Sequence, residues 1–118
     1  MTNDTLYSRG TPMSQGFRDV SPADVAARRG DARIVDVRQP AEFTGELGHV
    51  PGAELVPLGT LPDAARGWDR EAPIVLVCRS GARSSSGAAQ LVAAGFRRVM
   101  NLAGGMMAYN AHGLPIER

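Results

Sequence analysis

The stretch Ile74–Gly95, IVLVCRSGARSSSGAAQLVAAG, joins an apolar run, a glycine-containing loop and a helical pattern. The run Ile74–Val77 is too short for a helix and rich in β-branched residues, so it predicts a strand that is buried on both faces, as in a parallel sheet. Beyond the loop, apolar residues recur at helical spacing, serines 84–86 are candidates for the N-cap, and Gly95 is a suitable C-terminal stop. We therefore expect Cys78 where a strand ends and a helix begins.

That position is chemically suited to an anion. The amides of a turn and of a helix N-terminus converge on one point and carry partial positive charge. Arg79 and Arg83 add two permanent charges, and Gly81 allows the backbone to turn tightly. We expect these groups to hold the pKa of Cys78 below its ordinary value and to favour a reactive thiolate. The alternative, a small apolar residue that completes a core strand, fits an isolated cysteine but leaves this loop unexplained.

The loop CRSGARS at 78–84 resembles the active-site loop of the rhodanese family of sulfurtransferases, of the single-domain kind. IVDVRQPAEF at 34–43 and GHVPGAELVPL at 48–58 resemble the first two signatures of that family, and VMNLAGGMMAYNAHGLPIE at 99–117 resembles its closing signature. Each piece alone is weak evidence, but the four occur in the order of the family around a suitably placed cysteine.

The resemblance implies a thiosulfate sulfurtransferase of the rhodanese type. A sulfane sulfur would pass from thiosulfate or a persulfide donor to Cys78, and then to a thiol or cyanide acceptor. The acceptor could also be a protein thiol. The resemblance implies neither a metal nor an organic cofactor. The residues that it assigns to substrate binding are Arg79, Ser80, Gly81, Ala82, Arg83 and Ser84.

The rest of the chain predicts an α/β fold in which strands alternate with helices. We expect a rhodanese-like, central, mainly parallel five-stranded sheet with helices on both faces, formed by residues 17–118, and a flexible N-terminal leader at residues 1–16. Strands are expected at 17–20, 34–37, 53–57, 74–77 and 99–102, and helices at 23–29, 39–43, from 61 onward, after the Cys78 loop, and at 106–111.

Three charged residues lie at or beyond the carboxyl end of the second strand. Asp36 and Arg38 would support the site, either by bordering the Cys78 loop or by bracing loops through hydrogen bonds, and the sequence leaves both roles open. Glu42 falls where two-domain thiosulfate and mercaptopyruvate members of the family tend to carry an arginine that holds the anionic substrate. Because a carboxylate cannot replace it, we expect weaker activity toward those donors, although single-domain members commonly have an acid there.

The two histidines and three of the methionines are interpreted as structural. An ionised thiolate needs no general base, so neither His49 nor His112 is expected to act as one. Two histidines and one cysteine also make a poor zinc site. Met100, Met106 and Met107 are expected to pack in the core.

Composition excludes several classes of function. The net charge is +1, and the 13 basic residues are all arginines scattered along the chain, so no nucleic-acid partner is expected. No apolar run approaches the roughly 20 residues that span a membrane. The first fifteen residues lack the apolar core of a signal peptide, which favours a cytoplasmic location.

Three alternatives to enzymatic sulfur transfer are open. A rhodanese-like module can serve only to bind a partner, but such modules usually lack the nucleophile. The domain could carry sulfur to one partner protein. A cysteine-dependent phosphatase or arsenate reductase can use the same fold, but those enzymes carry five residues between cysteine and arginine, whereas four separate Cys78 from Arg83.

Overall fold

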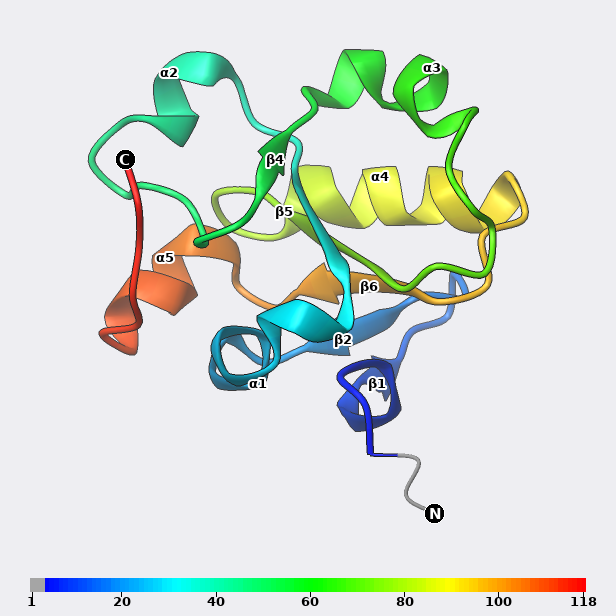
Figure 1. Ribbon diagram of the computed structural model, residues 1–118, viewed down its shortest axis with the longest axis horizontal. Coiled ribbons are helices and arrows are strands. Elements are labelled where there is room, and N and C mark those ends of the chain that lie inside the picture. The colour runs from blue at the N-terminus through cyan, green and yellow to red at the C-terminus, as the bar shows by residue number, and fades with distance from the viewer. Residues whose placement is uncertain (1–3) are drawn as a thin grey trace.

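The computed structural model describes residues 4–118, and its centre is a six-stranded sheet with the strand order β1-β2-β6-β5-β3-β4 (Figure 1). The outer strand β1 is antiparallel to β2, and every other neighbouring pair is parallel. The carboxyl ends of five strands therefore meet at one edge of the sheet. The strands are β1 (Thr11–Pro12), β2 (Arg18–Val20), β3 (Arg33–Asp36), β4 (Glu54–Leu55), β5 (Ile74–Val77) and β6 (Val99–Leu102).

Helices cover both faces of this sheet (Figure 1). Helices α3 (Leu61–Ala65) and α4 (Ala82–Ala93) pack on one face, whereas α1 (Pro22–Ala27) and α5 (Gly105–Ala111) pack together on the other. The short helix α2 (Pro40–Phe43) lies above the carboxyl edge. Within residues 4–118 there are also three 3₁₀ turns, at Tyr7–Arg9, Arg29–Asp31 and Leu58–Thr60.

Two apolar clusters hold the layers together, one on each face of the sheet. Leu76, Ala88 and Leu91 belong to the cluster beneath α3 and α4, and Val75, Met100 and Tyr109 belong to the cluster beneath α1 and α5. All residues of β5 and β6 are buried. Their apolar runs thus feed both clusters, as expected for central strands of a parallel sheet.

The predicted α/β fold, its mainly parallel sheet and the helices on both faces are confirmed. The strand count was wrong by one, because β1 pairs with β2 through Thr11 and Pro12. Two exposed residues carry no alternating pattern, so nothing in the sequence marks this strand.

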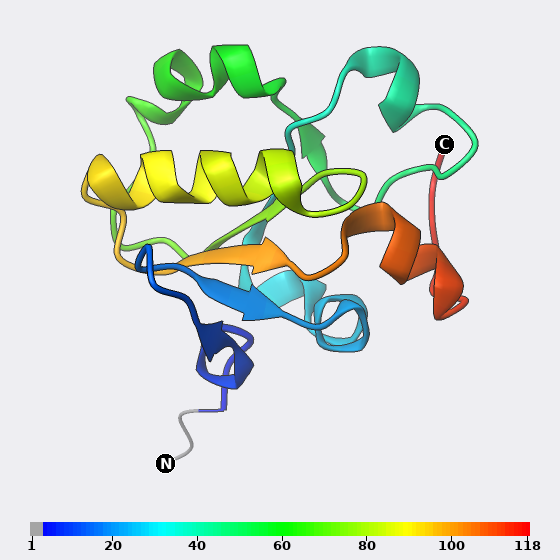
Figure 2. The same ribbon diagram turned by 180° about the vertical axis from the view of Figure 1, so that it is seen from behind.

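Residues 4–16, part of the segment expected to be a leader, join the domain through β1, which lies beside β2 as Figure 2 shows from behind. Leu6 is fully buried, and its amide donates to Asp31 Oδ2 at 3.0 Å. Residues 1–3 of that segment lie outside the described residues, and the division into a leader and a domain stays a prediction. Within residues 4–118, no helix is long and apolar enough to cross a membrane.

Candidate functional site

Cys78 directly follows β5 and begins the loop that leads into α4. Serines 84–86 were the expected N-caps, and this was wrong: α4 already begins at Ala82, with Gly81 as its N-cap residue. Gly81 has a φ of +103°, in the left-handed region that residues with a Cβ rarely adopt, so the chain can turn sharply from the strand into the helix. The serines therefore lie within the first turns of α4. The expected stop at Gly95 is confirmed by its φ of +96°.

This early helix start surrounds the Cys78 sulfur with hydrogen-bond donors. Sγ accepts from the Gly81 amide at 3.1 Å, from the Ser84 amide at 3.3 Å and from the Ser84 hydroxyl at 3.2 Å. Burial of the thiol raises its pKa, but the hydrogen bonds from Ser84, Gly81 and Ser80 outweigh burial and hold the pKa of Cys78 below its ordinary value. The loop is thus arranged to stabilise negative charge on sulfur.

The first turn of α5 fixes the outer side of the same loop. The amides of Met106 and Met107 donate to the carbonyls of Cys78 and Arg79, at 2.9 and 3.0 Å. Gly105 makes this approach possible, because a Cβ there would lie 2.5 Å from the Arg79 carbonyl carbon and oxygen. The loop carbonyls are therefore engaged by α5, while loop amides face the sulfur.

Arg83 points toward α2. Its two terminal nitrogens donate to the two oxygens of Glu42, each at 2.8 Å. These hydrogen bonds lower the pKa of Glu42 to about 2. Two arginines had been expected to lower the Cys78 pKa, but hydrogen bonds within the loop account for most of that effect. Arg83 instead forms its side-chain hydrogen bonds with Glu42, a partner 41 residues away in sequence.

Asp36 and Arg38 form a fully buried ion pair beside the loop. Arg38 donates from Nε to Asp36 Oδ1 at 2.9 Å and from Nη2 to Oδ2 at 2.8 Å. The same Nη2 donates to the Gly48 carbonyl at 2.6 Å, which braces the segment between α2 and β4. The bracing role is therefore realised. Asp36 is also aligned with Val77 across β3 and β5, so the pair lies next to Cys78.

A cavity of about 460 Å³ opens beside the loop. Arg79 is the one loop residue that lines it. Cys78 does not reach the cavity wall, because it is only 1% exposed. Arg38 and Glu42 bring their paired charges to its wall. The remaining lining residues are Ala41, Gly45, Glu46 and Leu47.

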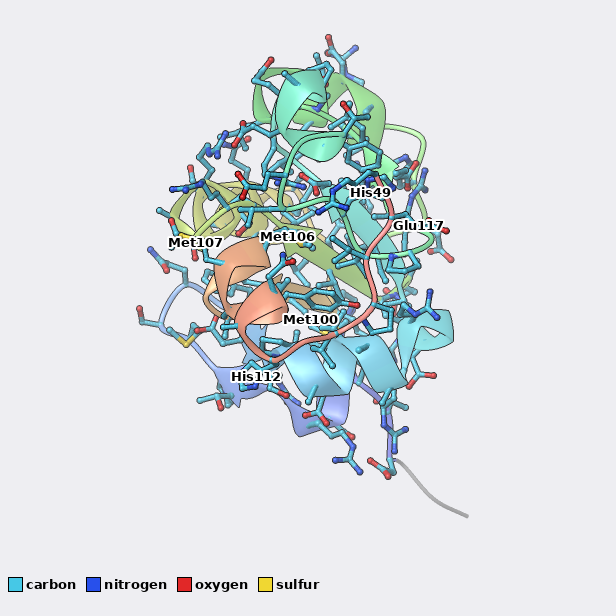
Figure 3. The ribbon with its side chains drawn as sticks, turned by 90° about the vertical axis from the view of Figure 1, so that its left-hand side faces the viewer. His49, Met100, Met106, Met107, His112 and Glu117 are labelled. Atoms are coloured by element: carbon cyan, nitrogen blue, oxygen red, sulfur yellow. The ribbon has the colours of Figure 1, made fainter. Side chains whose placement is uncertain are left out.

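His49 makes structural contacts. Figure 3 shows it beside Glu117, and its Nε2 lies 3.9 Å from a carboxylate oxygen of that residue. Its ring stacks on Phe43 with centroids 3.6 Å apart, and Nδ1 lies 2.7 Å from the Phe43 carbonyl oxygen. These contacts agree with the interpretation of His49 as a packing residue. His112 lies on the far side of α5 from this pair (Figure 3).

Met107 corrects one expectation. Met100 and Met106 are fully buried, as expected, but Met107 is 48% exposed. Its amide binds the Arg79 carbonyl, so the residue lies at the amino end of α5 beside the loop, where its side chain faces outward (Figure 3).

Sequence reasoning missed two polar residues behind the loop. Asn101 lies on β6 and its Oδ1 is 2.5 Å from the Ser84 hydroxyl oxygen, whereas its Nδ2 donates to Asp19 Oδ1 at 3.0 Å. An amide inside the apolar run VMNL was the one available signal. Among residues 4–118, no three histidine, cysteine, aspartate or glutamate side chains gather as metal ligands would.

The relatives of this chain include named sulfurtransferases. A sulfurtransferase of Allochromatium vinosum is 41% identical over 86 residues, which are 73% of this chain and 78% of that protein. The thiosulfate sulfurtransferase GlpE of Pseudomonas aeruginosa is 35% identical over 94 residues, which are 79% of this chain and 84% of that protein.

A solved structure from Rhodopseudomonas palustris, described as a protein of unknown function and possible tyrosine phosphatase, is 27% identical. It superposes with a TM-score of 0.75 and covers 86% of this chain and 85% of its own. The family model for the rhodanese-like domain matches residues 21–112, a range that includes every residue of the Cys78 loop. The chain therefore belongs to the rhodanese-like domain family.

Proposed function

We propose that this protein is a sulfurtransferase that moves a sulfane sulfur from thiosulfate or a persulfide donor, through a persulfide on Cys78, to a thiol or cyanide acceptor. The observation that carries the proposal is the set of three donors around the Cys78 sulfur, at 3.1 to 3.3 Å. The named sulfurtransferases among the relatives support the class of reaction.

The first step transfers sulfur to the protein. The Cys78 thiolate attacks the outer sulfur of the donor, and a new S–S bond forms as the old one breaks. With thiosulfate as donor, sulfite leaves with the electron pair of the broken bond. Because the thiolate is stabilised before the donor arrives, no general base is needed at this step.

The second step regenerates the thiolate. The acceptor thiolate or cyanide attacks the outer sulfur of the persulfide, and the electron pair of that S–S bond returns to Cys78. Both steps are nucleophilic displacements at sulfur and use the same cysteine, so ping-pong kinetics are expected. Neither step calls for a cofactor.

Each loop residue has a place in this scheme. The amides from Arg79 to Ser84 would cradle the anionic persulfide, and Arg79 would meet the donor at the cavity. Asp36 and Arg38 would keep the wall of the site in position. Arg83, held by Glu42, would contribute less charge to donor binding than its position in the loop suggests.

Sulfur carriage to a partner protein uses the same first step. It differs in the acceptor, which would be a protein thiol, and Met107 beside Arg79 offers exposed apolar surface near the cavity. The proposal places either reaction in the cytoplasm, where a lone thiol stays reduced.

Phosphate chemistry is the weaker alternative. A phosphoryl group needs donors around three equatorial oxygens, whereas the loop turns its amides onto one sulfur and Arg83 onto Glu42. We expect no appreciable hydrolysis of an aryl phosphate by the wild-type protein. Robust hydrolysis that depends on Cys78 would show that the protein acts as a phosphatase and would contradict the proposed sulfur transfer.

The direct assay is thiocyanate formation from thiosulfate and cyanide. Cys78→Ser should abolish it, because a serine hydroxyl is scarcely ionised at neutral pH, and circular dichroism should show the same fold. Ser86→Ala, an exposed change on the same helix, should retain the wild-type rate. Equal rates for Cys78→Ser and the wild type would refute the mechanism.

A further inference from the structure

The Ser84 hydroxyl has more acceptors than it can serve. Its oxygen lies 3.2 Å from Cys78 Sγ, 3.3 Å from the Gly81 carbonyl and 2.5 Å from Asn101 Oδ1. A hydroxyl carries one hydrogen, so it donates fully to only one of these groups at a time. Both Ser84 and Asn101 are buried, and bulk water does not supply a substitute donor.

Asp19 determines which end of the Asn101 amide faces Ser84. The two residues are paired in register between β2 and β6, and Asn101 Nδ2 donates to Asp19 Oδ1 at 3.0 Å. An ionised carboxylate only accepts hydrogen bonds, so the NH₂ end must point to Asp19 and the carbonyl end to Ser84. Asn101 is therefore an acceptor that faces the Ser84 hydroxyl.

We propose that Asn101, oriented by Asp19, is a positioning residue that competes with the Cys78 sulfur for the hydroxyl proton of Ser84. When the sulfur is protonated, Ser84 donates to Asn101. When the sulfur is anionic, the hydroxyl rotates toward it, and the buried Asn101 oxygen loses its partner. The proton stays on the Ser84 oxygen throughout, and no bond to it is broken.

The competition tempers the stabilisation of the thiolate. A thiolate that is strongly stabilised becomes a weaker nucleophile, and attack is fastest when its basicity is matched to the ambient pH. The Gly81 and Ser84 amides stabilise the anion regardless of Asn101. Asn101 reduces the stabilisation that the Ser84 hydroxyl gives to the thiolate, and so keeps the sulfur more nucleophilic. The importance of this for turnover rests on the proposed sulfur transfer.

Replacement of Asn101 by leucine isolates this effect, because it removes an acceptor of similar size without changing any charge. Every ionisable group near the sulfur would remain in place. These groups are Arg79 in the loop, Arg83 on α4, Asp36 at the end of β3, Arg38 two residues beyond it, Asp19 on β2 and Glu42 on α2.

The test is the rate of Cys78 alkylation by iodoacetamide against pH. Asn101→Leu should lower the midpoint, and it should speed alkylation below the midpoint by about two- to fivefold. Ser84→Ala should raise the midpoint, and adding Asn101→Leu to Ser84→Ala should change it no further. An unchanged or raised midpoint in Asn101→Leu would overturn the proposal, as would an equal effect in the Ser84→Ala background.

Asp19→Asn provides the same test if Asn101→Leu fails to fold, because Asp19 is only partly buried. An amide at position 19 lets the Asn101 amide turn and present its NH₂ to Ser84, which frees the hydroxyl for the sulfur. The lost charge of Asp19 also favours the thiolate, but that part persists in the Ser84→Ala background. A midpoint change of the same size in the wild-type and Ser84→Ala backgrounds would contradict the proposed competition for the Ser84 hydroxyl proton.

Alkylation reports the thiol alone, so this outcome is independent of sulfur transfer. If Asn101→Leu lowers the alkylation midpoint but the protein forms no persulfide, the competition for the Ser84 proton is supported and the proposed function is rejected. If the protein forms a persulfide but Asn101→Leu leaves the midpoint unchanged, the proposed function is supported and the competition is rejected.

Discussion

At the scale of single residues, the chemistry of the site depends on which arginines near Cys78 are paired with a carboxylate. Arg38 is paired with Asp36, and Arg83 is paired with Glu42. Arg79 also lines the cavity, and within residues 4–118 the structure shows no ion pair for it. We therefore expect a cavity with so little net charge to attract the doubly charged thiosulfate only weakly. Glu42 therefore bears on the choice of donor.

Glu42→Gln should raise kcat/KM for thiosulfate, because it frees the Arg83 guanidinium from its partner. The ion pair is partly exposed, so the expected gain is modest, about two- to fivefold. The gain should shrink at high salt and should be smaller for an alkyl persulfide, which carries a single negative charge on its sulfur. Glu71→Gln removes the same charge beside Arg97, before β5, and should leave both donors unaffected. A loss of thiosulfate activity in Glu42→Gln would show that the carboxylate serves the reaction in another way.

At the scale of elements, the β5–loop–α4 unit could be predicted because its signals are local: an apolar run, a glycine and a helical repeat. The expected N-caps of α4 lay at least three residues beyond the observed one, since a left-handed Gly81 supplies the turn and leaves Ser84 for the sulfur. Asn101 and Asp19 could not be paired from sequence, because 82 residues separate them and strand register alone brings them together. Arg83 and Glu42 could not be paired from sequence either, because they are 41 residues apart and lie on two different helices.

The contact between α5 and the loop gives a prediction at this scale. Gly105→Ala should destabilise the protein and slow Cys78 alkylation, because the new Cβ would lie 2.5 Å from the Arg79 carbonyl. Gly113→Ala is the matched control: its φ of +67° is close to the +62° of Gly105, but nothing lies within 4 Å of its Cβ. Both variants should lose about 1 kcal/mol to backbone strain, and only Gly105→Ala should lose more. Equal unfolding free energies and alkylation rates would mean that α5 does not hold the loop.

The N-terminal segment gives a second prediction at the element scale. Leu6 is fully buried against the cluster on the α1 and α5 face, so Leu6→Ala should lower the unfolding free energy by about 2–5 kcal/mol. Met13→Ala, at an exposed position of the same segment, should change it by less than about 0.5 kcal/mol. Urea denaturation measures both. A negligible effect of Leu6→Ala would support the expected separate leader.

At the scale of the whole molecule, the Glu42–Arg83 pair ties α2 to α4 across the carboxyl edge of the sheet. The pKa of Glu42 falls from 4.5 to about 2 on folding. A depressed carboxyl pKa adds stability above the unfolded value, and that stability is lost as the pH falls through the folded value.

Acid unfolding should therefore distinguish Glu42→Gln from the wild type by the shape of the pH profile. The wild type should lose this contribution between pH 4.5 and about 2, whereas Glu42→Gln should lack it throughout and show a flatter profile in that range. Unfolding free energies in urea, measured at several pH values, provide the comparison. Parallel profiles for the two proteins would mean that the pair does not stabilise the fold.

The central claim is that Cys78 carries the transferred sulfur, and mass spectrometry of the intact protein after exposure to thiosulfate tests it most directly. The account predicts a mass gain of one sulfur atom, located on the peptide that contains Cys78 and reversed by cyanide. Cys78→Ser should gain nothing under the same conditions. A wild-type protein that takes up no sulfur from thiosulfate or from a persulfide donor, or takes it up equally without Cys78, would contradict the account.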